Sequence, residues 1–87
     1  MAAYRLLIKA SAGRELERLG TKSDRRRIVE RIQALAEDPR PHGSEKLAGY
    51  ADRYRIRQGN FRVVYLIDDQ RREVTIFKVG DRKDVYR

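Results

Sequence analysis

The sequence predicts an α+β domain of two layers, in which two helices pack on one face of a sheet that contains a three-stranded antiparallel meander. Two observations predict this class. Apolar residues recur with helical spacing in two segments before Pro41, and from Leu47 onward the apolar pattern changes to period two. The chain has 87 residues, a length typical of one domain, so residues 1–87 are expected to form a single domain.

The N-terminal segment predicts a strand followed by a first helix. Tyr4–Lys9 is short and mostly apolar, and Ser11 after it is a suitable N-cap. Gly20 is expected to end this helix. Its buried stripe is formed by Ala12, Leu16 and Leu19.

A second helix is expected to begin near Ser23-Asp24, with Ser23 as its N-cap. Pro39 and Pro41 end it, and a loop rich in turn-forming residues follows up to Lys46. A short turn joins the two helices, so we expect an antiparallel helical hairpin with one shared apolar side. Its second helix contributes Ile28, Ile32, Leu35 and Ala36 to that side.

The C-terminal half predicts a meander of three antiparallel strands. The first strand ends before Gly59, the second covers Phe61–Ile67 and the third covers Val74–Val79, with turns between them. The pattern does not show where the N-terminal strand lies in this sheet.

Arginines alternate with apolar residues in the first strand of the meander, so they share one sheet face. A two-residue turn at Gly59-Asn60 pairs Arg62 with Arg57, and a turn at Gln58-Gly59 pairs it with Arg55. Either register places like charges side by side, which costs stability unless an anion binds between them. A three-residue loop would break this cluster, and the two-residue turns are favoured by hairpin statistics.

The overall charge also indicates a polyanionic partner. The chain carries 21 Lys and Arg against 13 Asp and Glu, a net charge of +8. An excess of this size on a small domain favours nucleic acid or an acidic protein as a ligand. Charged residues make up 39% and apolar residues 40% of the chain, a balance that indicates a folded domain and not a disordered tail.

Several other classes of function lack their residues. Without cysteine, the chain has no disulfide framework and no zinc–thiolate site. His42 is the only histidine and is expected to be exposed, so we expect no metal and no cofactor. No apolar run approaches the length of a membrane span, and we expect a cytoplasmic protein with no membrane partner.

The aromatic residues divide between packing and binding. Four of them have core-facing spacing, and Tyr54 fits either role, with the core favoured. Tyr86 near the C-terminus can present its ring to an unpaired base. The four core-facing aromatic residues are Tyr4, Phe61, Tyr65 and Phe77.

In order and spacing, several segments together resemble RelE-type toxins of the RelE/ParE superfamily, the toxin half of bacterial and archaeal toxin–antitoxin pairs. The resemblance covers essentially the whole chain. Its segments are the strand at Tyr4 to Ser11 with the helix after it, Leu35–Pro41, Lys46–Gly49, Tyr54–Arg57, Gly59–Tyr65 and Val79–Arg87.

This resemblance implies an endoribonuclease that cuts mRNA in the ribosomal A site without a metal ion. The ribose 2′-OH would attack the adjacent phosphate and leave a 2′,3′-cyclic phosphate. Arg55 and Arg57 would contact the mRNA and assist deprotonation of that hydroxyl. Arg62 would hold the phosphate and stabilise the charge that develops on it. Arg82 would protonate or stabilise the leaving 5′ oxygen, and Tyr86 would stack on a splayed base.

The same resemblance implies that Arg53, Arg55 and Lys83 bind RNA. Two departures from the family pattern affect activity. Relatives carry lysine where this chain has Arg55 and Arg57, and arginine is a poor general base because its pKa is above ~12. Many relatives also have histidine where Asp81 precedes Arg82. We therefore expect weak cleavage, with deprotonation left to water or the ribosome.

Expected partners are the mRNA, the ribosome with its rRNA, and a cognate antitoxin whose acidic segment wraps the toxin in a hetero-oligomer. Two alternative functions stay open. A ParE-type gyrase poison shares the fold but lacks the RNA-cutting set. A non-catalytic module would bind nucleic acid through backbone phosphates with steep salt dependence.

Overall fold

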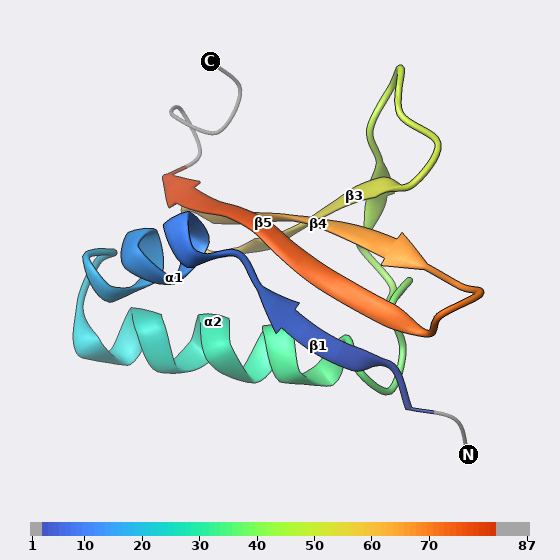
Figure 1. Cartoon of the computed structure of the whole chain (residues 1–87). Helices are drawn as coiled ribbons and strands as arrows, with labels where there is room; N and C mark the ends of the chain where they lie inside the picture. Colours follow the sequence, from blue (N-terminus) through green and yellow to red (C-terminus); the bar gives the residue numbers. More distant parts are fainter. Residues whose placement is uncertain (1–2, 82–87) are drawn as a thin grey trace.

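A computed structural model describes residues 3–81, which form two helices and a five-stranded sheet (Figure 1). The predicted α+β class and the order of strand, two helices and meander are confirmed. One short strand was not predicted, because it lies in the expected loop before Lys46. The elements are β1 (Arg5–Ile8), α1 (Ala10–Glu17), α2 (Lys22–Ala34), β2 (Glu45–Lys46), β3 (Arg53–Gln58), β4 (Phe61–Asp68) and β5 (Glu73–Asp81).

The strands lie in the order β1-β5-β4-β3-β2. β1 runs parallel to β5, with Leu6 opposite Val74, whereas the other neighbouring strands are antiparallel. The N-terminal strand therefore lies at one edge of the sheet and pairs with the last described strand. β2 forms the opposite edge through a two-residue pairing with β3.

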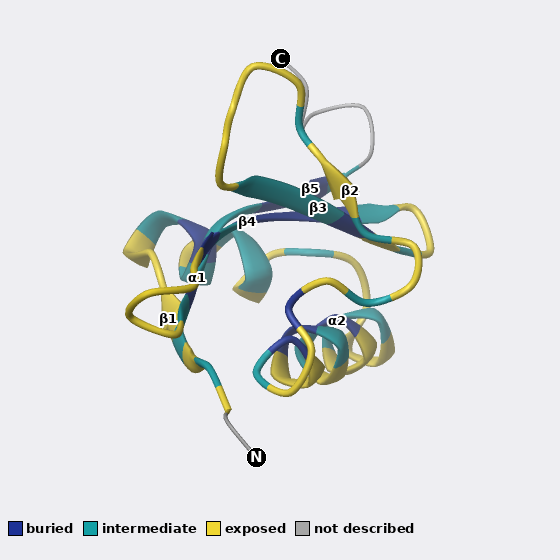
Figure 2. Cartoon of the chain, turned by 90° about the vertical axis from the view of Figure 1, so that its right-hand side faces the viewer, coloured by how far each residue is buried: buried dark blue, intermediate teal, exposed yellow. Residues whose placement is uncertain are grey.

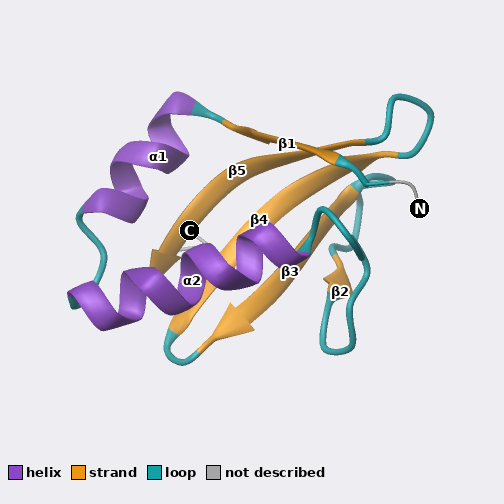
Figure 3. Cartoon of the chain, turned by 90° about the horizontal axis from the view of Figure 1, so that it is seen from below, coloured by secondary structure: helices purple, strands orange, loops and turns teal. Residues whose placement is uncertain are grey.

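Both helices cover the same face of the sheet, as the view from below shows (Figure 3). The core lies between these layers, where the inward residues of β3, β4 and β5 meet the apolar side of the helices (Figure 2). Burial of these side chains is the main stabilising contribution, at ~25 cal/mol per Å² of apolar area. The buried cluster is Ala12, Ile28, Ile32, Leu35, Ile56, Val63, Tyr65, Ile67, Val74, Ile76 and Val79.

The helix starts differ from the predicted ones. Ser11 lies inside α1, whose N-cap is Lys9 and has no side-chain cap bond. Thr21 caps α2 in place of Ser23. The Thr21 hydroxyl accepts a hydrogen bond from the Asp24 amide at 3.1 Å, and the Asp24 carboxylate accepts one from the Thr21 amide at 2.9 Å. This reciprocal capping box satisfies two N–H groups, which one cap at Ser23 would not do.

Gly20 is required by the turn between the helices. It adopts a left-handed conformation with φ of +52°, which favours glycine. A Cβ atom here would lie 2.8 Å from the Phe61 ring and 2.6 Å from the Asp24 carboxylate. The glycine thus allows the helix pair to approach the start of β4 and leaves the capping box in place.

An irregularity in the β4–β5 pairing reorients the aromatic residue of β5. Val64 lies opposite Lys78, but Tyr65 lies opposite Ile76, so Phe77 is the extra residue of a bulge. Phe77 was predicted to face the core. It is half-buried instead and lies against the cationic groups of Arg53 and Lys9. The other three aromatic predictions, and Tyr54, agree with the core cluster and its partly buried border.

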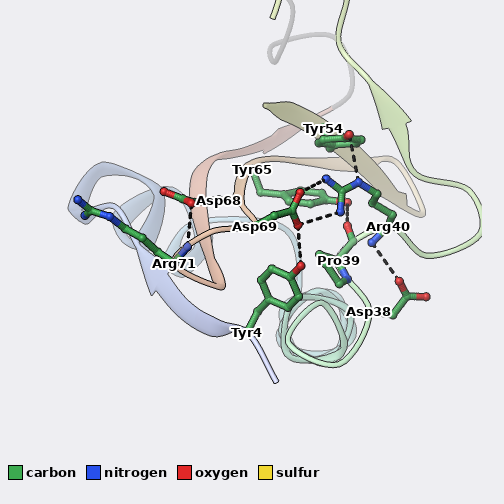
Figure 4. A network of polar contacts seen from close by, with 9 residues as sticks. All are labelled: Tyr4, Asp38, Pro39, Arg40, Tyr54, Tyr65, Asp68, Asp69 and Arg71. Atoms are coloured by element: carbon green, nitrogen blue, oxygen red, sulfur yellow. Dashed lines mark hydrogen bonds and ion pairs between the residues drawn. The ribbon is translucent and has the colours of Figure 1, made fainter. Parts of the chain in front are cut away.

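A polar network ties the segment after α2 to the far end of the sheet (Figure 4). The Arg40 guanidinium donates two hydrogen bonds to Asp69, at 2.8 and 3.2 Å, and a third to the Tyr54 hydroxyl at 3.2 Å. The Tyr4 hydroxyl donates to the same carboxylate at 2.6 Å. We call Tyr4, Arg40, Tyr54 and Asp69 the arginine latch.

Contacts within the latch also shift the pKa values of its members. The Arg40 guanidinium is the main cause that holds the pKa of Asp69 below its ordinary value. The hydrogen bond to Asp69 in turn raises the pKa of the Tyr4 hydroxyl. Next to the latch, the Tyr65 hydroxyl donates to the Pro39 carbonyl at 2.7 Å, and burial raises the pKa of Tyr65 to about 12.

Within residues 3–81, neither helix has the length and apolar character needed to cross a bilayer.

Candidate nucleic-acid interface

The sheet face away from the helices carries the predicted arginines. Tyr54 and Ile56 contribute to the core side of β3, so strand alternation places Arg53, Arg55 and Arg57 on the opposite, open face. The loop between β2 and β3 rises from the sheet on this open side, away from α2 (Figures 1 and 2). The open face therefore has a raised wall at its β2 edge.

Arg57 and Arg62 are cross-strand partners. The β3–β4 register places Arg57 opposite Arg62, as expected for a two-residue turn at Gly59-Asn60. Gly59 adopts φ of +61° there, which suits a tight hairpin. On its other side, Arg62 lies opposite Gly80 of β5, which has no side chain. Two like charges are thus held side by side by the backbone register.

Burial differs strongly within this pair. Arg62 is only 4% exposed and is the one charged residue among the described residues that is buried, whereas Arg57 is exposed. Burying a guanidinium beside a second cation carries an electrostatic cost. An anion on this face can bind to the exposed Arg57, because guanidinium groups bind phosphate oxygens with two donors.

Arg55 is oriented by an acidic neighbour. Its Nε and Nη2 both donate to Glu45 Oε1, at 3.1 and 2.9 Å. The Arg55 side chain is 22% exposed, so part of it stays accessible on the open face. The missed strand β2 has a role here, since its pairing with β3 places Glu45 directly opposite Arg55.

Arg53 lies between two aromatic rings. Its guanidinium carbon is 4.2 Å from the centre of the Tyr50 ring and 4.7 Å from that of Phe77, and the Lys9 ammonium lies 4.3 Å from Phe77 on β5. We call the series Lys9, Phe77, Arg53 and Tyr50 the cation–aromatic ladder. Contacts of this kind contribute ~0.5–1 kcal/mol each at exposed sites. Arg53, predicted to bind RNA, thus also orders the sheet face.

Two hollows lie at the edges of the sheet. The first, with a volume of about 430 Å³, is lined by Lys46, Leu47, Ala48, Tyr50 and Arg55. The second, of about 470 Å³, lies between α1 and the end of β5, where Glu15 accepts hydrogen bonds from the Val79 amide at 3.0 Å and from Lys78 at 3.1 Å. Glu15 thereby occupies an edge of β5 that β1 does not reach.

The remaining predicted site residues lie at or beyond the end of β5. Asp81 is the last residue of β5 and pairs with Phe61. Arg82, Lys83 and Tyr86 lie outside the described residues, so their predicted roles stay predictions. The backbone register brings Arg57 and Arg62 together with the end of β5, because Gly80 lies opposite Arg62.

His42 is exposed in the loop before β2. Among residues 3–81, no group of three acidic or histidine side chains is arranged to hold a metal ion. The shifted pKa values of the described residues belong to the arginine latch, to Tyr65 and to the capping carboxylate of Asp24. None of these groups lies on the open face.

Sequence reasoning missed Tyr50 and the bulge at Phe77. Tyr50 lies in a loop with Gly49 before it, and such a loop has no period that would predict a ring contact. A bulge likewise leaves no signal in an apolar strand. The one available hint was that Tyr50 lies three residues before Arg53. Residues this close in a short loop can bring their side chains into contact.

The comparison with known families is decisive for identity. Residues 6–86 match the family model described as the ParE toxin of the type II toxin–antitoxin system parDE. This chain belongs to the RelE/ParE superfamily of toxins. It is accordingly a toxin of a type II toxin–antitoxin system.

Solved structures similar to this toxin include RelE toxins, alone and in complexes with antitoxins. The isolated E. coli RelE toxin is 31% identical, with a TM-score of 0.80 over 97% of this chain and 92% of that chain. The RelE–RelB complex from Pyrococcus horikoshii is 30% identical, with a TM-score of 0.82 over 95% and 99%. The toxin–antitoxin complex RelBE2 from Mycobacterium tuberculosis is 28% identical, with a TM-score of 0.81 over 97% of each chain.

No curated protein sequence matches the toxin significantly. The matching family model is therefore named after ParE toxins, whereas the similar solved structures named above are RelE toxins, and both groups belong to one superfamily.

Proposed function

We propose that this toxin is a metal-independent endoribonuclease that cuts mRNA in the ribosomal A site. The observation that carries the proposal is the Arg57–Arg62 pair, in which the backbone register holds two guanidinium groups on one open face with Arg62 buried. Similarity to solved RelE toxins supports the same choice. A phosphate bound on this face would receive guanidinium donors that the backbone register holds in place.

The reaction is an attack of a ribose 2′-OH on the adjacent phosphorus. The bond to the leaving 5′ oxygen breaks, and the products are a 2′,3′-cyclic phosphate and a free 5′-OH. Arg62 stabilises the extra negative charge on the phosphate oxygens, since a buried group needs little reorganisation. Arg57 holds the phosphate beside the attacking hydroxyl.

Proton transfer is assigned differently from charge stabilisation. An arginine stays protonated at neutral pH, so Arg57 acts electrostatically and the 2′-OH proton goes to water or to a ribosomal group. Arg82 is proposed to stabilise or protonate the 5′ oxygen, and Tyr86 to stack on a base. Arg53, Arg55 and Lys83 are proposed to bind the RNA backbone.

The antitoxin is proposed as the second partner. The P. horikoshii, M. tuberculosis and E. coli relatives include toxin–antitoxin complexes. With a net charge of +8, this toxin favours a companion whose disordered segment is acidic and wraps the cationic face. A short acidic protein encoded beside the toxin that co-purifies with it in a hetero-oligomer, and dissociates at high salt, is the expected result.

A gyrase poison is the second candidate, and the ParE family match favours it. Primer extension on translated mRNA separates the functions. Cleavage within codons, resistant to a chelator, supports the ribonuclease, and loss of cleavage without ribosomes supports action in the A site. Gyrase-dependent DNA breaks would support the poison. Salt-sensitive RNA binding without any product would leave a non-catalytic module and overturn the ribonuclease proposal.

A further inference from the structure

The hollow at the β2 edge lies next to the arginines of the proposed cleavage site. Arg55 lines this hollow and also belongs to the arginine series of β3. Its volume of about 430 Å³ falls within the ~300–1,000 Å³ of small-molecule sites. An RNA strand bound at Arg57 can therefore continue along β3 and reach the hollow without leaving the open face.

The cation–aromatic ladder gives the hollow a fixed aromatic wall. Tyr50 is 48% exposed although it lies in contact with Arg53, so the ring keeps accessible surface toward the hollow that it lines. Arg53 is in turn held against Phe77 of β5. A ring that is ordered before binding loses little conformational entropy when a ligand stacks on it.

The remaining lining residues complement a nucleotide. Lys46 supplies positive charge for a phosphate, and Arg55, which Glu45 orients, keeps 22% of its side chain exposed. Leu47 and Ala48 supply apolar surface beside the ring. A stacking platform combined with backbone-binding cations is the usual arrangement for single-stranded nucleic acid. An acidic peptide would use the two cations but would gain less from an exposed aromatic ring.

We propose that this hollow is a nucleotide subsite, in which a base of the bound RNA stacks on Tyr50 while Lys46 and Arg55 bind its phosphate. The subsite rests on the proposed ribonuclease function and extends it. It lies at the β2 edge of the sheet, away from the strand β5 that leads to Arg82 and Tyr86, and contributes to the choice of cleavage sequence.

The experiment compares Tyr50→Ala and Tyr50→Phe with the unchanged toxin on translated mRNA, with the 5′ ends of the products sequenced. We expect Tyr50→Ala to cut about 5- to 150-fold more slowly, equivalent to the ~1–3 kcal/mol of one base–aromatic stack. The base preference at one position near the cut should also flatten. Tyr50→Phe keeps the ring and should retain both rate and preference.

A matched control separates this effect from a general loss of structure. His42→Ala changes an exposed loop residue outside the hollow and should leave rate and preference unchanged. Thermal melting of each variant reports folding. If Tyr50→Ala melts much lower than the unchanged toxin, Ala48→Trp replaces it, because it fills the hollow from an exposed position, and the same loss is expected.

The outcomes distinguish the subsite from the ribonuclease proposal. If the unchanged toxin cuts and Tyr50→Ala cuts with the same rate and base preference, the subsite is wrong and the ribonuclease stands. If Tyr50→Ala weakens only antitoxin binding, the hollow is a protein site and the inference is overturned.

If the unchanged toxin does not cut, the ribonuclease proposal fails and the subsite is tested directly. Ultraviolet crosslinking to a random 2′-O-methyl RNA heptamer should then give a nucleotide adduct on Tyr50. Its absence, together with equal RNA affinity of Tyr50→Ala, overturns the subsite as well.

Discussion

The two ends of β4 hold arginine in contrasting environments. Beyond its last residue, Arg40 binds Asp69 and lies over Tyr54, so its charge is matched within the fold. Near its first residue, Arg62 faces Arg57, which makes no ion pair with any of the described residues. An arginine matched by an acid stabilises the fold, whereas the exposed charge of Arg57 is available for a ligand. This contrast identifies the functional end of the sheet.

The largest expected effect follows removal of the buried cation. Arg62→Ala should slow mRNA cleavage by ~100-fold or more, as loss of one preorganised donor does in other enzymes. Arg62→Lys keeps the charge but loses the planar guanidinium fork, so its cleavage rate should lie between those of Arg62→Ala and the unchanged toxin. Primer extension measures both. Full activity of the alanine variant, with an unchanged melting temperature, would contradict the role given to Arg62.

Breaking the latch should have the opposite profile. Arg40→Ala removes an ion pair and a cation–π contact, and we expect a loss of ~1–2 kcal/mol of unfolding free energy. The melting temperature should fall by ~4–8 °C per kcal/mol, with cleavage retained. Arg71→Ala is the matched control, because it removes the same charge at a turn where the backbone amide of Arg71, and not its side chain, bonds to Asp68. Equal melting of the two variants would refute the latch.

A smaller effect is expected at the base of the latch. Tyr65→Phe removes the hydrogen bond to Pro39 and should cost ~1 kcal/mol at neutral pH. Because burial raises the folded pKa of Tyr65 from 10.0 to about 12, the folded state holds this proton more tightly. Its contribution is fully present below pH 10 and is lost as the pH rises to about 12. Denaturant titrations at several pH values between 10 and 12 give the unfolding free energy. This free energy should fall less steeply with pH for Tyr65→Phe than for the unchanged toxin.

The smallest effect concerns the repulsion between the paired arginines. Arg57→Gln removes one of two like charges in direct cross-strand register and should raise the unfolding free energy by a few tenths of a kcal/mol. The gain should shrink at high salt, because salt screens the repulsion. Urea unfolding at low and high ionic strength measures it. A loss of stability at low salt would show that the pair is not strained.

Local patterns predicted most of this fold. The period-two alternation gave the strands, and glycine before asparagine gave the turn that aligns Arg57 with Arg62. The position of β1 could not be predicted, since a parallel pairing with β5 leaves no local signal. The α2 cap was misplaced because Thr21 and Ser23 are both good caps, and the capping box with Asp24 decides between them.

The candidate site was predictable only in part. Arginine spacing identified the open face. The aromatic wall of the hollow depends on Tyr50 in a loop and on the bulge at Phe77, which both contact Arg53 from other parts of the chain. Phe77 reads as a core residue in sequence and becomes part of the open face through one extra residue in β5. The sequence predicted that Arg53 binds RNA. Its second role depends on the contact with the Tyr50 ring, which the sequence pattern does not show.

The pairing of β1 with β5 has a consequence for how the protein folds during its synthesis. β5 lies between β1 and β4 in the sheet and is synthesised after both of them. Until it emerges, neither the first strand nor β4 has its partner there, and such long-range pairing forms late. A chain that ends before β5 leaves β1 and β4 without this partner and cannot complete the sheet.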